Sequence, residues 1–319
     1  MRIVNSVLEL IGNTPLVRLS KVAKDLDAEV LVKLEYMNPT GSIKDRVALN
    51  MIDEAEKRGD LKPGDTIVEA STGNTGTALS FIGMIKGYKV GIYETTPGHM
   101  GNEKRKLMTN YGAHVEALST EFLDGVEGGV AGAEVERPGR AICLEREKNE
   151  PNIWWARQFS NPDGVKAQNQ TAEEILEQAG GSIDAYVSSI GTGGTLKGIA
   201  EVLKERLEHV KIIGAYPSSS KKPIVLGQPY PRTDFDGGTI SDMMDVPGLV
   251  DEVYQVTNEE AVEMAHRLWR EEGLFCGISS GANVLIALRV AERLGKGKKV
   301  VTVLPDNGYR YMTDERYVT

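Results

Sequence analysis

Apolar and polar residues recur along the chain with two periods, one typical of strands and the other of helices. Short apolar runs bounded by Gly, Pro and Asn predict strands, and apolar residues three or four positions apart predict helices. The expected strands are residues 16–19, 30–34, 66–70, 89–93, 114–118, 185–190, 210–215 and 299–304. The expected helices are residues 44–58, 77–86, 102–111, 171–178, 196–206, 258–272 and 281–294. Because strands and helices alternate, we expect an α/β fold with a parallel sheet and crossover helices.

Composition narrows the kinds of partner. The 319 residues can form two domain-sized units, and 40% hydrophobic with 26% charged residues is typical of a soluble globular protein. A net charge of -9 without a cluster of Lys and Arg argues against nucleic acid and anionic membrane surfaces. Small metabolites are therefore the expected partners. Two cysteines, and no apolar run that suits a signal peptide or a membrane span, favour a reducing cytoplasm.

Metal chemistry has no support in the sequence. Cys143, Cys276 and the four histidines are scattered without the spacing of metal ligands, so no metal site is predicted. Both cysteines are interpreted as small buried apolar residues. The full motifs of a serine hydrolase, a Walker phosphate loop and a dinucleotide-binding turn are also absent.

The first chemical candidate is Lys44, which lies where the helix at residues 44–58 is expected to begin. Ser42 and Asp45 have the spacing of an N-cap pair for this helix. The positive end of a helix dipole disfavours a protonated ammonium, so an amine placed there is suited to forming a Schiff base. The alternative interpretation is an ordinary solvated lysine at a helix start.

Two loops of glycine and hydroxyl residues follow predicted strands and open predicted helices. In this arrangement free backbone N–H groups point at an anion. Residues 71–76 would suit the carboxylate of an amino acid, although a plain strand-to-helix turn also explains them. Residues 191–195, with three glycines and two threonines, suit a phosphate. Residues 125–140 interrupt the pattern and are interpreted as an exposed loop or an insertion.

An amine primed for a Schiff base, a carboxylate loop and a phosphate loop together describe pyridoxal-phosphate chemistry. The chain also resembles the cysteine synthase and cystathionine β-synthase family of fold type II pyridoxal-phosphate enzymes. The resemblance rests on five motifs in order, at residues 12–16, 38–46, 71–76, 191–195 and 277–281. It implies two three-layer αβα subdomains with mostly parallel sheets, as in the β subunit of tryptophan synthase. Residues 1–38 and 150–319 would form the larger, cofactor-binding subdomain, and residues 39–149 a smaller, mobile one.

The resemblance assigns a role to each residue of the expected site. Lys44 would carry pyridoxal 5'-phosphate, Asn74 would hold its ring hydroxyl and Ser279 its pyridine nitrogen. The phosphate would be bound by Gly191, Thr192, Gly193, Gly194 and Thr195. The positions that match substrate binding in the family are Ser71, Thr72, Gly73, Thr75 and Gln158.

The activity implied by the resemblance is β-replacement on an activated serine, O-acetylserine or O-phosphoserine, with sulfide to give L-cysteine. It would proceed through an external aldimine and an aminoacrylate, with Lys44 as general base. A homodimer is also implied. Departures from the family pattern after Asn161-Pro162 and at Tyr216-Pro217 leave the donor and the nucleophile open.

Three other functions stay open. A serine or threonine dehydratase or a racemase shares the fold, and β-replacement could also use a thiol or an amine. A non-catalytic binding subunit is the third, but an intact Lys44 argues against it because a scaffold has no need of the amine.

Overall fold

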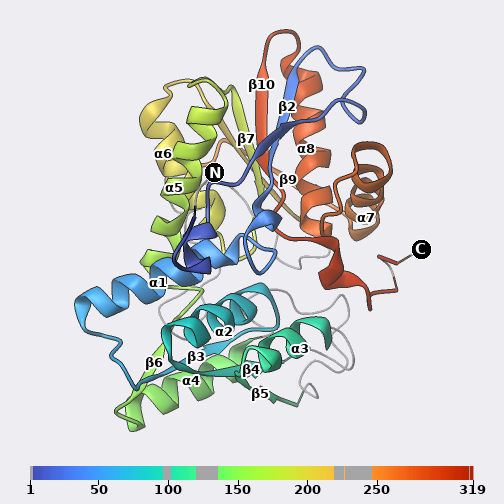
Figure 1. Cartoon of the computed structure of the whole chain (residues 1–319). Coiled ribbons are helices and arrows are strands. Elements are labelled where there is room, and N and C mark those ends of the chain that lie inside the picture. The colour runs from blue at the N-terminus through green and yellow to red at the C-terminus, as the bar shows by residue number, and fades with distance from the viewer. Residues whose placement is uncertain are drawn as a thin grey trace.

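The structure is a computed structural model of the chain (Figure 1), and it describes residues 3–95, 102–119, 136–218, 226, 246–315 and 317–318. It contains two β-sheets, each with helices on both faces. The six strands of the larger sheet run in the order β1 (Leu16–Arg18), β2 (Glu29–Lys33), β10 (Lys299–Val303), β7 (Ala185–Ser189), β8 (Lys211–Pro217) and β9 (Glu252–Val256). The smaller sheet has the order β5 (His114–Ala117), β4 (Lys89–Glu94), β3 (Thr66–Ala70) and β6 (Ile153–Trp155).

All neighbouring strands are parallel except β1, which pairs antiparallel with β2. This confirms the expected α/β architecture with mostly parallel sheets. β6 and β9 were not expected from the sequence. β6 spans three residues, too few to show a period, and β9 is an edge strand whose residues are mostly half-buried.

The helices complete two three-layer sandwiches (Figure 1). α5 (Pro162–Gln178) and α6 (Gly194–Arg206) cover one face of the larger sheet, and α7 (Asn258–Arg267) and α8 (Ile278–Leu294) cover the other. α2 (Asn74–Lys86) and α3 (Asn102–Asn110) pack on one face of the smaller sheet, opposite α4 (Arg137–Asn149). α1 (Lys44–Arg58) lies between the two halves and packs against both α2 and α5.

The described residues also form four short helical turns: η1 (Val7–Leu10), η2 (Glu35–Met37), the π-helical η6 (Leu268–Glu272) and η7 (Gly308–Tyr311). Residues 125–135 of the expected loop or insertion lie outside the described residues, while its end forms the start of α4. Within the described parts of the chain, no helix combines the length and hydropathy that a membrane span requires.

The expected cap of α1 is wrong. Ile43 is the N-cap residue and makes no side-chain cap bond. The Ser42 hydroxyl accepts from the Lys44 N–H at 3.3 Å, and the Asp45 carboxylate accepts instead from the Thr40 N–H at 2.7 Å. Asp45 is fully buried, so its charge goes to the nearest backbone donor in the preceding loop rather than back to Ser42.

Several helices begin earlier than their sequence predicts. α2 begins at Asn74, α6 at Gly194 and α8 at Ile278, so the glycine and hydroxyl residues expected in loops form the first helical turns. The residues of these loops have weak helix propensity, but packing against the sheets overrides it. As a result, the backbone N–H groups of the candidate loops point out of helix N-termini.

Candidate active site

Lys44 stands at the start of α1, where the chain is bonded to the loop that follows β10. The Ile43 N–H donates to the Pro305 carbonyl at 2.8 Å, and the Asn307 N–H donates to the Gly41 carbonyl at 3.2 Å. Gly41 has a φ of 86°, and a Cβ there would lie 2.1 Å from the Asn307 side-chain nitrogen. Glycine is therefore required at this position, both for its backbone conformation and for the close approach of the two loops.

Asp306 is the residue at which three loops meet. Its carboxylate accepts from the Asn74 amide at 2.7 Å and from the Tyr311 hydroxyl at 2.7 Å. Its backbone carbonyl accepts from the Gly277 N–H at 2.9 Å, and its backbone pairs with that of Ser42. Asp306 therefore brings the start of α1, the start of α2 and the start of α8 together.

The environment of Lys44 favours its neutral amine. Burial lowers the pKa of Lys44, while the negative charges of Glu136 and Asp306 act in the opposite direction. Desolvation has the larger effect, as expected for an ammonium removed from water. A lowered pKa raises the share of the neutral amine, which is the form that acts as a nucleophile and can accept a proton.

The loop expected to bind a phosphate, residues 191–195, lies at the same edge of the larger sheet as Asp306. β7 and β10 are adjacent and parallel, so residues 191–195 after β7 and Asp306 after β10 leave the sheet at one end. Gly193 caps α6 with a φ of 89°, and the first turn of α6 carries no acidic residue. A Cβ built on Gly191 would meet no atom of the described residues within 4 Å.

The loop expected to bind a carboxylate, residues 71–76, runs from the end of β3 into α2, at the edge of the smaller sheet. The Ser71 hydroxyl is buried and accepts from the backbone N–H groups of Gly73 at 3.3 Å and Gly76 at 3.0 Å. Thr75 is also buried, in the first turn of α2. Ser71 thus holds the loop in shape through its own hydroxyl.

Thr72 and Gln158 point their donors at one carboxylate. The Thr72 N–H and the Gln158 side-chain amide donate to Glu136 at 3.0 and 3.1 Å. Gln158 comes from the segment after β6, and its amide also donates to the Ala70 carbonyl at 2.7 Å. The structure therefore brings together two residues that the resemblance assigned to substrate binding.

Ser279 lies in the first turn of α8 and is half-buried, two residues after Gly277. A Cβ on Gly277 would lie 2.2 Å from the Asp306 carboxylate, so glycine lets the start of α8 approach Asp306. Together with the contact of Asp306 to Asn74, this places Lys44, Asn74 and the turn that contains Ser279 around one residue.

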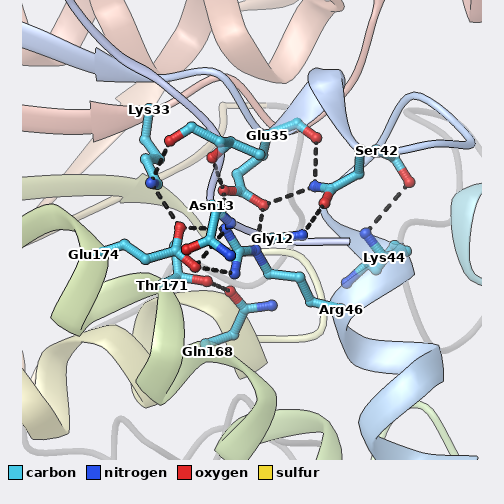
Figure 2. Close-up of polar contacts among 12 residues, drawn as sticks. Gly12, Asn13, Lys33, Glu35, Ser42, Lys44, Arg46, Gln168, Thr171 and Glu174 are labelled. Atoms are coloured by element: carbon cyan, nitrogen blue, oxygen red, sulfur yellow. Dashed lines mark hydrogen bonds and ion pairs between the residues drawn. The ribbon is translucent and has the colours of Figure 1, made fainter. Parts of the chain in front are cut away.

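A buried ion-pair network links the start of α1 to α5 (Figure 2). Arg46 reaches between two carboxylates, 2.8 Å from Glu35 and 2.7 Å from Glu174, and Lys33 lies 2.7 Å from Glu174. The Asn13 N–H also donates to Glu174, at 3.0 Å. The motif at residues 12–16 therefore helps to fix α1 against α5.

The sequence missed several of these residues. Asp306, Glu136 and Arg310 were not singled out from the sequence, and neither was the ion-pair network. Arg310 donates to the Asn74 side-chain oxygen at 2.8 Å. These residues carry no local motif, because each acts through a partner distant in the sequence. Among the described residues, no three His, Cys, Asp or Glu side chains are grouped as metal ligands.

Comparison with known proteins agrees over nearly the whole chain. The family model described as "Pyridoxal-phosphate dependent enzyme" matches residues 7–306. A cysteine synthase of Staphylococcus aureus (strain Mu50 / ATCC 700699) is 40% identical over 319 residues, which cover 98% of this chain and 97% of the relative.

Two solved structures resemble the fold closely. The crystal structure of a cysteine synthase (OASS) from Entamoeba histolytica has a TM-score of 0.84 at 36% identity, and the match covers 99% of this chain and 91% of the other. The crystal structure of an O-ureido-L-serine synthase has a TM-score of 0.84 at 33% identity, covering 99% of this chain and 96% of the other.

Proposed function

Because the chain belongs to the family of pyridoxal-phosphate dependent enzymes, we propose that it replaces the β-substituent of an activated serine with sulfide to give L-cysteine. The cysteine synthases among its relatives support this reaction. Pyridoxal 5'-phosphate is the cofactor of the family. The carrying observation is the position of Lys44, a desolvated amine at the meeting point of the three helix starts.

The residues around Lys44 fit this cofactor. Burial lowers the pKa of the amine, and the start of α6 offers a site for an anion with no acidic residue in its first turn. One oxygen of Asp306 is buried beside Gly277 and has no hydrogen-bond partner among the described residues. When bound, pyridoxal phosphate supplies an electron sink for the charge that develops at Cα of the amino acid.

Residues of the chain itself would bind the cofactor, bind the substrate and transfer the proton. Lys44 would hold the cofactor and then remove the Cα proton with its Nζ atom. Residues 191–195 would bind the phosphate, and Asn74 and Ser279 would bind polar atoms of the ring. Ser71, Thr72, Gly73, Thr75 and Gln158 would bind and orient the substrate carboxylate.

The finer properties are also part of the proposal. O-acetylserine or O-phosphoserine is the donor, and the protein acts as a homodimer in the cytoplasm. The chain divides into a larger cofactor-binding part and a smaller mobile part, as set out above. β6 lies beyond residue 149 yet pairs with β3, so the smaller sheet takes one strand from the segment assigned to the larger part.

A second candidate is β-replacement with a nucleophile other than sulfide. The similarity to an O-ureido-L-serine synthase favours it, because the named product carries oxygen and not sulfur on Cβ and the likeness extends over nearly the full length of both chains. A dehydratase would instead release a keto acid without any added nucleophile.

One spectroscopic experiment tests the proposal and separates these reactions. The purified protein should be yellow, and Lys44→Ala should lose both the colour and the turnover. Titration with O-acetyl-L-serine, O-phospho-L-serine and L-serine should change the visible spectrum only with the true donor, and sulfide should restore it. A wild-type protein that stays colourless after addition of pyridoxal phosphate refutes the proposal. Restoration by another nucleophile, such as a thiol, an amine or a hydroxyl compound, but not by sulfide favours the second candidate. Pyruvate formed from serine alone favours a dehydratase.

A further inference from the structure

Glu136 uses the hydrogen-bond donors that the proposed function reserves for the substrate. Its carboxylate accepts from the Thr72 N–H at 3.0 Å, from the Thr72 hydroxyl at 3.4 Å and from the Gln158 amide at 3.1 Å. Glu136 is 7% exposed, so water does not compete for these contacts. The free protein therefore already has a carboxyl group seated on the donors of the carboxylate loop.

Two carboxylates compete for one set of donors. Each N–H of Thr72 and Gln158 can make one good hydrogen bond at a time. A substrate carboxylate that uses the same donors must displace Glu136, because these donors are already engaged by its carboxyl group.

The groups around Glu136 shift its pKa in opposite directions. Burial raises the pKa of Glu136 to about 8, the backbone N–H of Thr72 opposes this shift, and the charge of Glu69 on β3 adds to it. Arg140 on α4 favours the ionised form. A carboxyl group that is costly to ionise is held less firmly by its donors than a fully ionised one.

The backbone allows the side chain to leave. Glu136 is the N-cap residue of α4, and its carbonyl accepts from the Arg140 N–H at 2.9 Å. Rotation of the Glu136 side chain leaves this helical hydrogen bond intact. The carboxyl group can therefore move without unwinding the first turn of α4.

We propose that Glu136 occupies the carboxylate-binding donors of Thr72 and Gln158 in the free protein and is displaced by the amino-acid substrate, so that it sets the affinity of the site. This inference rests on the proposed function, since it takes residues 71–76 and Gln158 as the substrate carboxylate site. It assigns Glu136 a role in affinity and not in the bond-making steps.

The test uses the holoenzyme and L-alanine, an amino acid with no leaving group on Cβ. The dissociation constant is measured by isothermal titration calorimetry for the wild type, Glu136→Ala and Glu145→Ala. Glu145 is an exposed residue of the same helix and serves as the matched control. We expect Glu136→Ala to bind L-alanine about tenfold or more tightly, since its donors are no longer engaged, while Glu145→Ala binds like the wild type. KM for the serine donor should fall in parallel.

A second measurement needs no variant. In a crystal structure of the wild-type holoenzyme with L-alanine, the Glu136 carboxylate should lie beyond hydrogen-bond distance of the Thr72 N–H. A folded Glu136→Ala protein with unchanged or weaker affinity overturns the inference, and so does a complex in which Glu136 still accepts from Thr72. If turnover with O-acetyl-L-serine persists in either case, the proposed function stands and only the role of Glu136 falls. If the wild-type holoenzyme binds neither L-alanine nor a serine donor, both fall.

Discussion

Replacing Glu174 by glutamine tests how strongly the buried network stabilises the start of α1. Glu174 is 8% exposed and accepts from Arg46, Lys33 and the Asn13 N–H. The substitution keeps the shape of the side chain but removes its charge. Arg46 retains Glu35 as a partner, whereas Lys33 loses the carboxylate to which it is paired in Figure 2.

The size of the effect follows from the pKa of Glu174. Burial opposes ionisation, but the hydrogen bonds and charge of Arg46, with Lys33, hold the pKa of Glu174 at about 2, against an ordinary value of 4.5. A difference of roughly 2.5 between folded and unfolded pKa values corresponds to about 3 kcal/mol of stability at neutral pH. Loss of one partner from a buried ion pair typically costs about 3–5 kcal/mol, which agrees.

Urea unfolding followed by circular dichroism measures this change. Glu174→Gln should unfold at a clearly lower urea concentration at pH 7. The folded-state pKa is depressed, so the stabilisation is fully present above the ordinary value and is lost as the pH falls toward 2. The gap between wild type and variant should therefore narrow as the pH is lowered from about 5 to about 3.

The neighbouring residue provides the control. Glu173 is 51% exposed and pairs with Arg206, which is 57% exposed. Surface pairs of this kind contribute about 0–1 kcal/mol, so Glu173→Gln should unfold close to the wild type. If Glu174→Gln loses no more stability than Glu173→Gln, the network does not hold α1 as described.

Three further predictions concern the site. Gly41→Ala should destabilise the protein by about 1–3 kcal/mol and reduce turnover, because the residue has a positive φ and the new Cβ would clash with Asn307. Thermal unfolding measures the loss of stability, and an activity assay measures the loss of turnover. Asp306→Asn should lower the pKa of Lys44 further, because it removes a negative charge that raises this pKa. The rate at which the apo-protein takes up pyridoxal phosphate should therefore begin to rise at lower pH. An unchanged pH profile would contradict this. Both cysteines are buried, and burial raises the pKa of Cys276 to about 12. Neither cysteine should therefore react with a thiol reagent at pH 8 in the native protein. Rapid labelling before unfolding would refute this prediction.

Local pattern was sufficient for the architecture of the chain. Most strands and helices were expected within a few residues, because apolar periodicity records which face of each segment is buried. The start of α1 at Lys44 and the two glycine-rich loops, residues 71–76 and 191–195, were also recognisable from local residues. Their roles in the site remain predictions. Local pattern failed at short or weakly patterned elements, such as β6, β9 and α4.

The meeting of distant segments could not be predicted in this way. Asn74 and Asp306 are 232 residues apart, Arg46 and Glu174 are 128 apart, and Thr72 and Glu136 are 64 apart. None of these pairs has a sequence signature, since an Asp or Glu in a polar segment is usually solvated. Each carboxylate affects stability or the pKa of a neighbour only because the fold buries it beside that partner.

The sequence by itself determined which segments form strands and helices, and it marked one lysine and two glycine-rich turns as candidates for chemistry. It could do so because helix and strand periods and glycine conformations are properties of neighbouring residues. The tertiary structure alone decided that Lys44 lies beside Asp306 and that Glu136 is seated on Thr72 and Gln158. The electrostatic state of a buried group depends on what surrounds it in space, and that depends on how the two sheets pack together.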